Sequence, residues 1–274
     1  MPKPTLIRLS SLLLAALLSA CGGSAIIYEN GDSAPSQHPD LSNVPDAVPR
    51  VEPRSRYGNP ESYVVRGQRY YVQQSSANFS QRGIASWYGT KFHGRRTSSG
   101  EPYDMFAMTA AHKTLPLPTY LEVINLRNNK RVIVKANDRG PFHANRIIDL
   151  SYAAATRLGI AASGTGLVEI RALNPVAPES VTPPAKSTIV TDKTTVEPNM
   201  YLQIGAFSSQ DNAKRLHNKL HSAAFDRTSI TTANPAGNTV YRVRIGPLST
   251  VDEADQLVDQ LAALGINEAR VVID

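Results

Sequence analysis

Prolines divide this chain and limit where a hydrophobic core can form. The 19 prolines concentrate near the N-terminus and again between residues 174 and 198. Segments of this composition bury too little apolar surface to offset the entropy that they lose on ordering. The sequence therefore predicts a disordered tether over residues 21–62, a first folded domain over 63–174, a linker over 175–198 and a second domain over 199–274.

The first twenty residues have the layout of a secretory signal peptide. Lys3 and Arg8 precede an apolar run over residues 9–18, and small residues follow that run. A run of this length is too short to span a bilayer as a helix. We therefore expect residues 1–20 to be removed on export.

The single cysteine of the chain, Cys21, directly follows this segment. The order Leu18-Ser19-Ala20-Cys21 resembles the lipobox of bacterial lipoproteins, and the glycine after it resembles an outer-membrane sorting pattern. The resemblance implies that Cys21 becomes an acylated N-terminus, which anchors the protein to the outer membrane facing the periplasm. A chance cysteine in an ordinary signal peptide is the alternative. No second cysteine exists for a disulfide, a thiol nucleophile or a thiolate metal site.

Positive charge is concentrated in the first domain. The formal charge is +6, and loss of the signal peptide leaves 27 basic against 23 acidic residues. Residues 82–174 hold 13 Lys and Arg against 6 Asp and Glu, whereas residues 197–274 hold 7 against 9. No basic helix or arginine-rich tract accompanies this charge, which argues against nucleic acid and favours an anionic polysaccharide as the partner.

The first domain has the pattern of short strands joined by turns. Strands are predicted over residues 84–88, 120–126, 131–136 and 167–173, with a hairpin over 63–72. One helix is predicted over residues 152–158, because Ser151 can cap its free amides and Gly159 can end it. The domain is therefore mainly β.

An internal repeat with an offset of 41 residues shapes the second domain. The stretch from Ile204 to Leu220 matches the stretch from Ile245 to Leu261 at its strand, serine and leucine positions. Each copy predicts a strand, a serine cap, an amphipathic helix and a further strand. Two such units predict an α+β domain, with a four-stranded antiparallel sheet and both helices on one face.

Ionisable residues gather on two loop-rich stretches of the first domain. Loops on a rigid scaffold are where binding and catalytic residues concentrate. The candidates are His93, Glu101, Asp104 and His112 in the first stretch, Asp138, Arg139 and Asp149 in the second, and the strand aromatics Trp87 and Tyr88. Each of them has an alternative role in packing, in a turn or in a helix cap.

Six short motifs in the same order carry a resemblance to a known family. They are Gly-Ile-Ala-Ser-Trp-Tyr-Gly from residue 83, Phe-His-Gly-Arg from 92, Gly-Glu-Pro-Tyr-Asp from 100, Thr-Ala-Ala-His from 109, Asn-Asp-Arg-Gly-Pro-Phe from 137 and Ile-Asp-Leu-Ser from 148. This part of the chain resembles the rare lipoprotein A (RlpA) family. The C-terminal repeat, which opens with Tyr-Leu-Gln-Ile-Gly-Ala-Phe from residue 201, is similar to a SPOR domain. The resemblance implies a double-psi β-barrel followed by a SPOR domain.

The resemblance also implies an activity, that of a lytic transglycosylase acting at the division septum. Such an enzyme cleaves MurNAc–GlcNAc β-1,4 bonds of peptide-free glycan without water and leaves 1,6-anhydro ends. One carboxyl group can protonate the leaving oxygen and then accept the proton of the attacking 6-hydroxyl. We assign this role to Asp149 or Glu101. We expect Asp104 to stabilise positive charge at the anomeric centre and to hold a proton on Glu101 by coupling, and His112 to hydrogen-bond a carboxylate or sugar.

The remaining candidates are expected to bind substrate. In the barrel the set that lines the groove is Trp87, Tyr88, His93, Asp138 and Arg139. In the SPOR domain, strand alternation predicts that Gln203, Phe207, Arg242 and Arg244 point away from the helices, and Ser208 and Asn212 complete the glycan-binding set. Amide, aromatic and guanidinium groups suit a sugar backbone that bears hydroxyls and carboxylates.

No cofactor or metal is expected. His93, His112 and His143 lack a metal-ligand spacing, and residues 97–100 lack the flanking pattern of a nucleophile elbow. Two non-catalytic functions fit the same residues: an expansin-like binder of peptidoglycan recruited to the septum, and a tether between the outer membrane and the wall. The carboxylates and histidine that stand in their family positions favour the enzyme, with division proteins at the septum as candidate partners.

Overall fold

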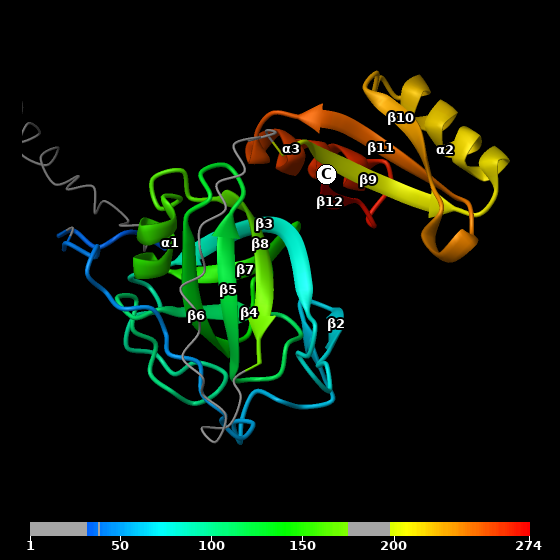
Figure 1. Ribbon diagram of the computed structural model, residues 1–274. Coiled ribbons are helices and arrows are strands. Elements are labelled where there is room, and N and C mark those ends of the chain that lie inside the picture. Colours follow the sequence, from blue (N-terminus) through cyan, green and yellow to red (C-terminus); the bar gives the residue numbers. More distant parts are fainter. Residues whose placement is uncertain (1–31, 38, 175–197) are drawn as a thin grey trace, which may run out of the picture. The chain divides into compact units, whose positions relative to one another are not determined.

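The computed structural model describes residues 32–37, 39–174 and 198–274 (Figure 1). The predicted signal peptide, Cys21, the start of the predicted tether and nearly all of the predicted linker lie outside these ranges. Within them, no helix has the length and apolar character that crossing a membrane requires.

Six strands of the first domain close into a barrel in the order β3-β7-β4-β6-β5-β8 (Figure 1). Their bounds are β3 (Ser80–Tyr88), β4 (Thr109–His112), β5 (Thr119–Asn125), β6 (Arg131–Asp138), β7 (Arg146–Ser151) and β8 (Gly166–Leu173). β3 pairs in parallel with β7 and β4 with β6, and the other neighbours are antiparallel. Parallel neighbours cannot be joined by a tight hairpin, so the chain crosses over between them. This topology confirms the predicted double-psi barrel.

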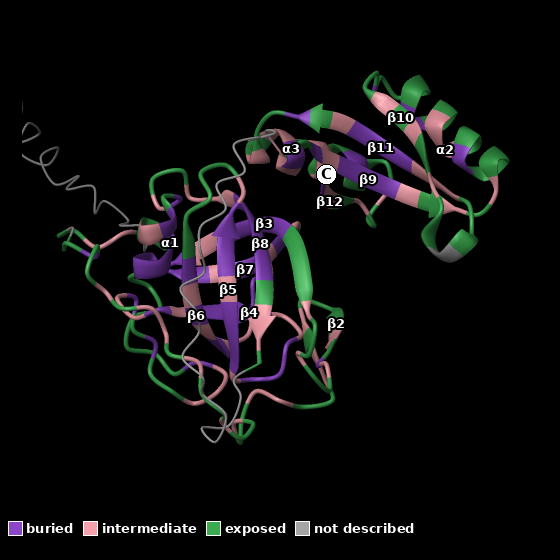
Figure 2. Ribbon diagram, in the orientation of Figure 1, coloured by how far each residue is buried: buried purple, intermediate pink, exposed green. Residues whose placement is uncertain are grey.

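The barrel interior is filled by aliphatic side chains, and Figure 2 shows its strands as mostly buried. In β7, Ile148 and Leu150 are fully enclosed, whereas Asp149 between them points to the opposite face. Helix α1 (Tyr152–Leu158) follows directly and has the predicted bounds. The Ser151 hydroxyl accepts a hydrogen bond from the Ala154 amide at 3.2 Å, and Gly159 ends the helix with a left-handed φ of 75°.

Residues 32–37 and 39–61 pack along the barrel, and we call them the strap. Proline-rich composition predicts a disordered tether here, and for this described part that prediction is wrong. The strap is ordered because it packs against the barrel, where Leu41 is buried in the hydrophobic core. Main-chain hydrogen bonds also hold it: the Ala47 amide donates to the Ile133 carbonyl at 3.0 Å, and the Ser55 amide donates to the Leu117 carbonyl at 2.9 Å. The predicted hairpin follows the strap as β1 (Ser62–Val65) and β2 (Gln68–Tyr71).

The second domain is a four-stranded antiparallel sheet in the order β10-β11-β9-β12. Its elements are β9 (Met200–Phe207), α2 (Gln210–Ser222), β10 (Thr228–Ala233), a 3₁₀ helix (Pro235–Gly237), β11 (Val240–Leu248), α3 (Val251–Ala263) and β12 (Arg270–Ile273). Leu202 and Ile245 of the sheet share one core with Leu220 of α2 and Leu261 of α3. Both helices therefore cover the same face, as the repeat predicts.

Candidate active site

A row of side chains crosses four neighbouring strands of the barrel on the face that Asp149 occupies. Ser86 of β3 is the register partner of Asp149, Ala111 of β4 is its partner on the other side, and Asp138 of β6 is the partner of Ala111. Register partners lie on the same face of a sheet. Asp149 thus sits in the middle of a polar row, where residues far apart in the sequence come together.

The Asp149 carboxyl group is largely enclosed and hydrogen-bonded. The Ser86 hydroxyl donates to its Oδ1 at 2.5 Å. Burial raises the pKa of Asp149, while the Ser86 hydrogen bond and the charges of Lys113 and Arg146 oppose that rise without cancelling it. Gly140 lies above the group, and a Cβ added there would lie 3.7 Å from Oδ2. The absence of a side chain at Gly140 leaves access to the carboxyl.

Lys113 is a cationic neighbour of Asp149 that the sequence did not single out. It directly follows β4, and its charge acts on the Asp149 carboxyl group. Its ammonium donates to the Arg146 carbonyl at 2.8 Å. Burial lowers the pKa of Lys113 and the charge of Asp149 opposes this. The only available sequence signal was its place directly after the Thr-Ala-Ala-His motif.

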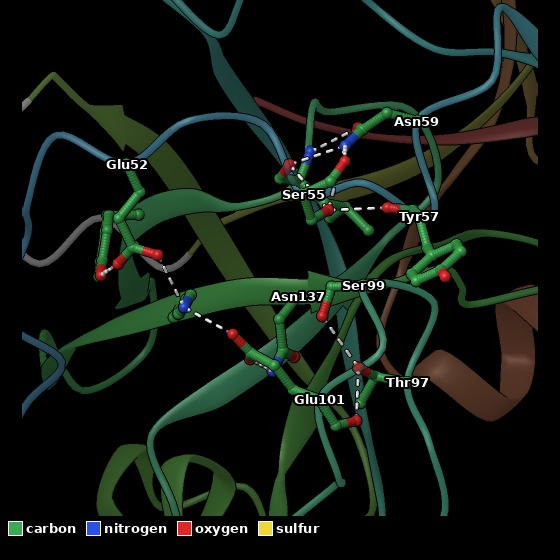
Figure 3. A network of polar contacts seen from close by, with 11 residues as sticks. Glu52, Ser55, Tyr57, Asn59, Thr97, Ser99, Glu101 and Asn137 are labelled. Carbon is green, nitrogen blue, oxygen red and sulfur yellow. Dashed lines mark hydrogen bonds and ion pairs between the residues drawn. The ribbon is translucent and has the colours of Figure 1, made fainter.

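Figure 3 shows the polar contacts of Glu101, whose environment differs from that of Asp149. Its Oε1 accepts from the Lys135 ammonium at 2.9 Å and its Oε2 from the Asn137 amide at 2.7 Å. Burial acts to raise the pKa of Glu101, but the hydrogen bonds from Asn137 and Lys135 outweigh it, so the pKa is lowered. The predicted raised pKa is therefore wrong, because these two donors stabilise the ionised form. The nearby acidic group that opposes the lowering is Glu52 of the strap.

The loop that carries Glu101 is held to β6 by short polar contacts. The Thr97 amide and hydroxyl both donate to the Glu101 carbonyl, at 2.8 and 2.9 Å. Asp138 accepts from the Ser98 amide at 2.7 Å and from the Ser98 hydroxyl at 2.6 Å. Asp138 thereby positions the loop through its Oδ1 atom.

Asp104 and His93 lie together on the exposed part of the same loop. Asp104 Oδ1 accepts from the Phe106 amide at 2.9 Å and lies 3.7 Å from His93 Nδ1, which itself accepts from the Met105 amide at 3.2 Å. Both side chains remain about half exposed, at 56% and 45%. They form a solvent-accessible pair within reach of a ligand on the loop.

His112 is not on the face where Asp149 lies. It pairs with Ile148 across β4 and β7, so it points to the opposite side of the sheet, and it is only 3% exposed. Its Nδ1 accepts from the Thr114 and Leu115 amides at 3.2 and 3.0 Å. Burial, and then the charges of Arg139 and Lys113, lower the pKa of His112 to about 3. The structure therefore does not show the predicted contact of His112 with a carboxylate or sugar. Its imidazole is buried and neutral, and it binds the main-chain amides of the turn after β4.

Arg139 is a structural link rather than a free cation. Its guanidinium donates to the carbonyls of Gly58 at 2.8 Å, Leu115 at 2.6 Å and His112 at 3.1 Å. It therefore joins the strap to the connection between β4 and β5. Its side chain makes no ion pair with Asp138 in the described structure, since the bond between these residues runs from the Arg139 main-chain amide.

The two strand aromatics are packing residues. The Trp87 indole nitrogen donates to the Ala161 carbonyl at 3.2 Å, and its ring meets Tyr152 edge-on at 5.3 Å. The Tyr88 ring is buried and stacks on Tyr103 at 3.9 Å. Packing therefore accounts for Tyr88, whereas Trp87 is held in place and remains partly exposed.

In the SPOR domain the structure gathers part of the predicted glycan-binding set. Gln203 pairs with Arg244 on one side and Arg270 on the other, on the face opposite the helices. The Arg244 guanidinium donates to Asp274 at 2.6 Å and lies 5.6 Å from the Tyr201 ring centroid. Gln203 and Arg244 are both buried, whereas side chains on an open sheet face would be exposed to solvent.

Phe207 lies on the wrong face for the predicted set. The register of β9 against β11 shifts between the Val243–Gly205 and Arg244–Gln203 pairs, which inserts an extra residue and reverses the alternation beyond it. A Cβ at Gly205 would meet the Phe207 ring at 2.8 Å and Leu216 of α2 at 3.1 Å, so Phe207 packs on the helix side. Arg242 keeps its predicted face. Ser208 and Asn212 are exposed at the start of α2, where Asn212 accepts from Arg215.

Comparison with known proteins defines the class of this molecule. The family model described as lytic transglycolase matches residues 80–170, which is the barrel, and the SPOR domain model matches residues 197–271. The chain is thus a lytic transglycolase-type barrel joined to a SPOR domain. The crystal structure of the RlpA SPOR domain from Pseudomonas aeruginosa is 29% identical, with a TM-score of 0.25, and covers 27% of this chain and 96% of that one.

Full-length relatives place the chain more narrowly. The endolytic peptidoglycan transglycosylase RlpA of Pseudomonas aeruginosa is 37% identical over 322 residues, which cover 95% of this chain and 94% of the relative. The protein of the same name from Vibrio cholerae is 36% identical, with 94% of each chain covered. The chain therefore belongs to the RlpA family.

Proposed function

We propose that this protein is an endolytic peptidoglycan transglycosylase, and that Asp149 is its acid/base. The observation that carries the proposal is the contrast between two carboxyl groups on one barrel. Burial raises the pKa of Asp149, whereas Asn137 and Lys135 keep Glu101 ionised despite its burial. A pair of carboxyl groups with pKa values pushed apart is the arrangement that separates a proton donor from a charge stabiliser.

The reaction then proceeds with one proton moving through Asp149. Asp149 donates it to the glycosidic oxygen as the C1–O bond breaks, and the leaving sugar takes the bonding electrons. The MurNAc O6 attacks C1, its hydroxyl proton passes to the Asp149 carboxylate, and the 1,6-anhydro ring closes. The Ser86 hydroxyl and the nearby Lys113 charge stabilise Asp149 while it is ionised. Ionised Glu101, with Asp104 on the same loop, supplies negative charge near the anomeric centre.

The rest of the chain delivers this barrel to its substrate. Acylated Cys21 anchors the protein to the outer membrane, and the SPOR sheet binds peptide-free glycan through Gln203, Arg242 and Arg244. Family membership and the SPOR domain model support a septal cell-envelope location. Septal division proteins are proposed partners.

The test is digestion of peptide-free peptidoglycan followed by mass spectrometry of the products. The wild-type protein should release fragments with 1,6-anhydroMurNAc ends. Asp149→Asn keeps an acceptor for Ser86 but cannot carry the proton, so kcat should fall by about 100-fold or more. Glu122→Gln, which removes a partly buried carboxylate of β5 that pairs with Arg131, is the matched control and should be as active as wild type. Undigested strands with the wild-type protein would support the expansin-like binder instead.

A further inference from the structure

Two carboxylates of the strap, those of Asp32 and Glu52, accept hydrogen bonds from groups beside the proposed site. The Asp32 side chain accepts from the Gly89 amide at 2.6 Å and from the Lys91 amide at 3.1 Å. The Ser33 carbonyl next to it accepts from the Thr90 amide at 3.0 Å. A Cβ at Gly89 would lie only 2.1 Å from that carbonyl oxygen, so the approach of the strap requires glycine there. The Gly89 and Lys91 amides thus form a two-donor cradle for a carboxylate.

A second carboxylate of the strap, that of Glu52, pairs with the Lys135 ammonium, which also binds Glu101 (Figure 3). The Lys135 ammonium lies 3.0 Å from Glu52 Oε2 and 2.9 Å from Glu101 Oε1. The Tyr120 hydroxyl also donates to Glu52. One ammonium therefore faces two carboxylates, one from the proposed catalytic loop and one from the strap.

Both contacts belong to the surroundings of the same site. The Asp32 charge is close enough to Asp149 to contribute to the raised pKa of that group. Beyond Glu52 the strap also reaches the loop that carries Glu101: the Tyr57 ring would lie 3.3 Å from a Cβ at Gly100, and the Ser98 carbonyl 2.7 Å from one at Gly58. The strap therefore contacts the surroundings of both proposed carboxyl groups.

We propose that the Gly89–Lys91 amide cradle and the Lys135 ammonium are carboxylate-binding subsites for the lactyl groups of peptide-free glycan, and that Asp32 and Glu52 fill them until substrate arrives. This inference rests on the proposed function. Removal of a stem peptide converts a neutral lactyl amide into a carboxylate. Amide N–H groups and an ammonium donate only, and they bind a carboxylate more strongly than an amide. The same groups thereby give a preference for stripped strands.

The strap then acts as an intramolecular competitor. A ligand that must displace a tethered group binds with an apparent affinity equal to its intrinsic affinity multiplied by the fraction of time the site is free. Removing the strap carboxylates should therefore strengthen substrate binding.

The first experiment measures kinetics on peptide-free glycan strands with the full mature chain. The double variant Asp32→Ala/Glu52→Ala should lower KM by about three- to tenfold. KM is the readout, because loss of the Asp32 charge also lowers the pKa of Asp149 and thereby changes kcat. Asp40→Ala is the matched control, because Asp40 is a strap carboxylate whose contacts are with Ser42 alone among the described residues, and it should behave as wild type. An unchanged or higher KM in the double variant would overturn the competition.

A second arm tests which group of the glycan is recognised. Strands whose lactyl carboxylates have been converted to primary amides should bind the wild-type protein more weakly, and the double variant should gain nothing on them. Equal binding of carboxylate and amide strands would exclude lactyl recognition.

A third arm does not depend on turnover. Peptide-free strands are titrated into nitrogen-labelled Asp149→Asn protein, and the Gly89 and Lys91 amide resonances are expected to shift on binding. If these shifts appear while the wild-type protein forms no anhydro product, the proposed activity fails and the subsites stand. If products form but neither amide responds, the subsites fail and the activity stands.

Discussion

At the scale of single residues, two carboxyl groups on one barrel experience opposite environments. Asp149 is buried beside a single hydroxyl donor, so its protonated form persists to higher pH. Glu101 receives an ammonium and an amide and stays ionised. Both residues were nominated from the sequence as the acid/base, and their burial and hydrogen-bond partners in the fold distinguish them.

Ser86 should tune the acid at position 149 without touching the substrate. Its hydrogen bond stabilises the ionised carboxylate and so lowers the pKa of Asp149. Ser86→Ala should therefore move the alkaline limb of the kcat/KM profile to higher pH and lower kcat by about tenfold, the equivalent of ~1.4 kcal/mol. Ser80→Ala, at the exposed start of β3, is the control. A lower kcat with an unmoved alkaline limb would mean that Ser86 matters only for packing.

At the scale of elements, the connection between β4 and β5 is held by a buried imidazole. His112 accepts two main-chain amides of this connection, and Arg139 donates to its carbonyls. The Thr-Ala-Ala-His motif forms β4, a strand that the sequence pattern did not predict, and its histidine points inward. His112 and Arg139 thus stabilise the connection between β4 and β5 next to the loops of the proposed site.

The His112 contribution to stability should depend on pH with a definite sign. Its pKa is depressed in the folded state to about 3, against 6.5 in the unfolded chain. The stabilisation is thus fully present above pH 6.5 and is lost as pH falls toward 3, on the order of 3 kcal/mol between pH 7 and pH 4. His112→Asn keeps an acceptor near Nδ1 but does not titrate, so its urea midpoint should fall less over this range than that of wild type. Parallel declines in the two proteins would contradict this.

At the scale of the whole molecule, two folded domains divide the work that the family membership implies. The residues proposed for catalysis lie on the barrel, and those proposed for recruitment lie on the four-stranded sheet of the SPOR domain. Cleavage and wall binding should therefore be separable by substitution.

Substitutions in the two domains should have complementary effects. Arg242→Gln on the face of the SPOR sheet opposite the helices should weaken co-sedimentation with peptide-free sacculi by about tenfold, because a charged partner for glycan carboxylates is lost. The same variant should still cleave short soluble strands. Asp149→Asn should show the reverse, with binding retained and products absent. Arg227→Gln, which removes a surface arginine that pairs with Glu253, is the control for charge. Loss of both activities in one variant would argue against this division.

The sequence by itself determined whatever depends on local pattern or on neighbours along the chain. The helix over residues 152–158 was predicted with its capping residues, because a cap and a left-handed end are local features. The 41-residue repeat likewise predicted the topology of the second domain. The motifs brought Glu101 and Asp149 forward as candidates.

Only the tertiary structure decided what depends on contacts between distant residues. A β-bulge in β9 moved Phe207 to the helix side, and inward pairing removed His112 from the face of Asp149. Lys135, Lys113 and Ser86 acquired their importance from partners on other strands. The strap is ordered by a core that belongs to the barrel, so its composition alone predicted disorder. In each case the deciding energy comes from burial or a hydrogen bond across the fold, which no local window of sequence contains.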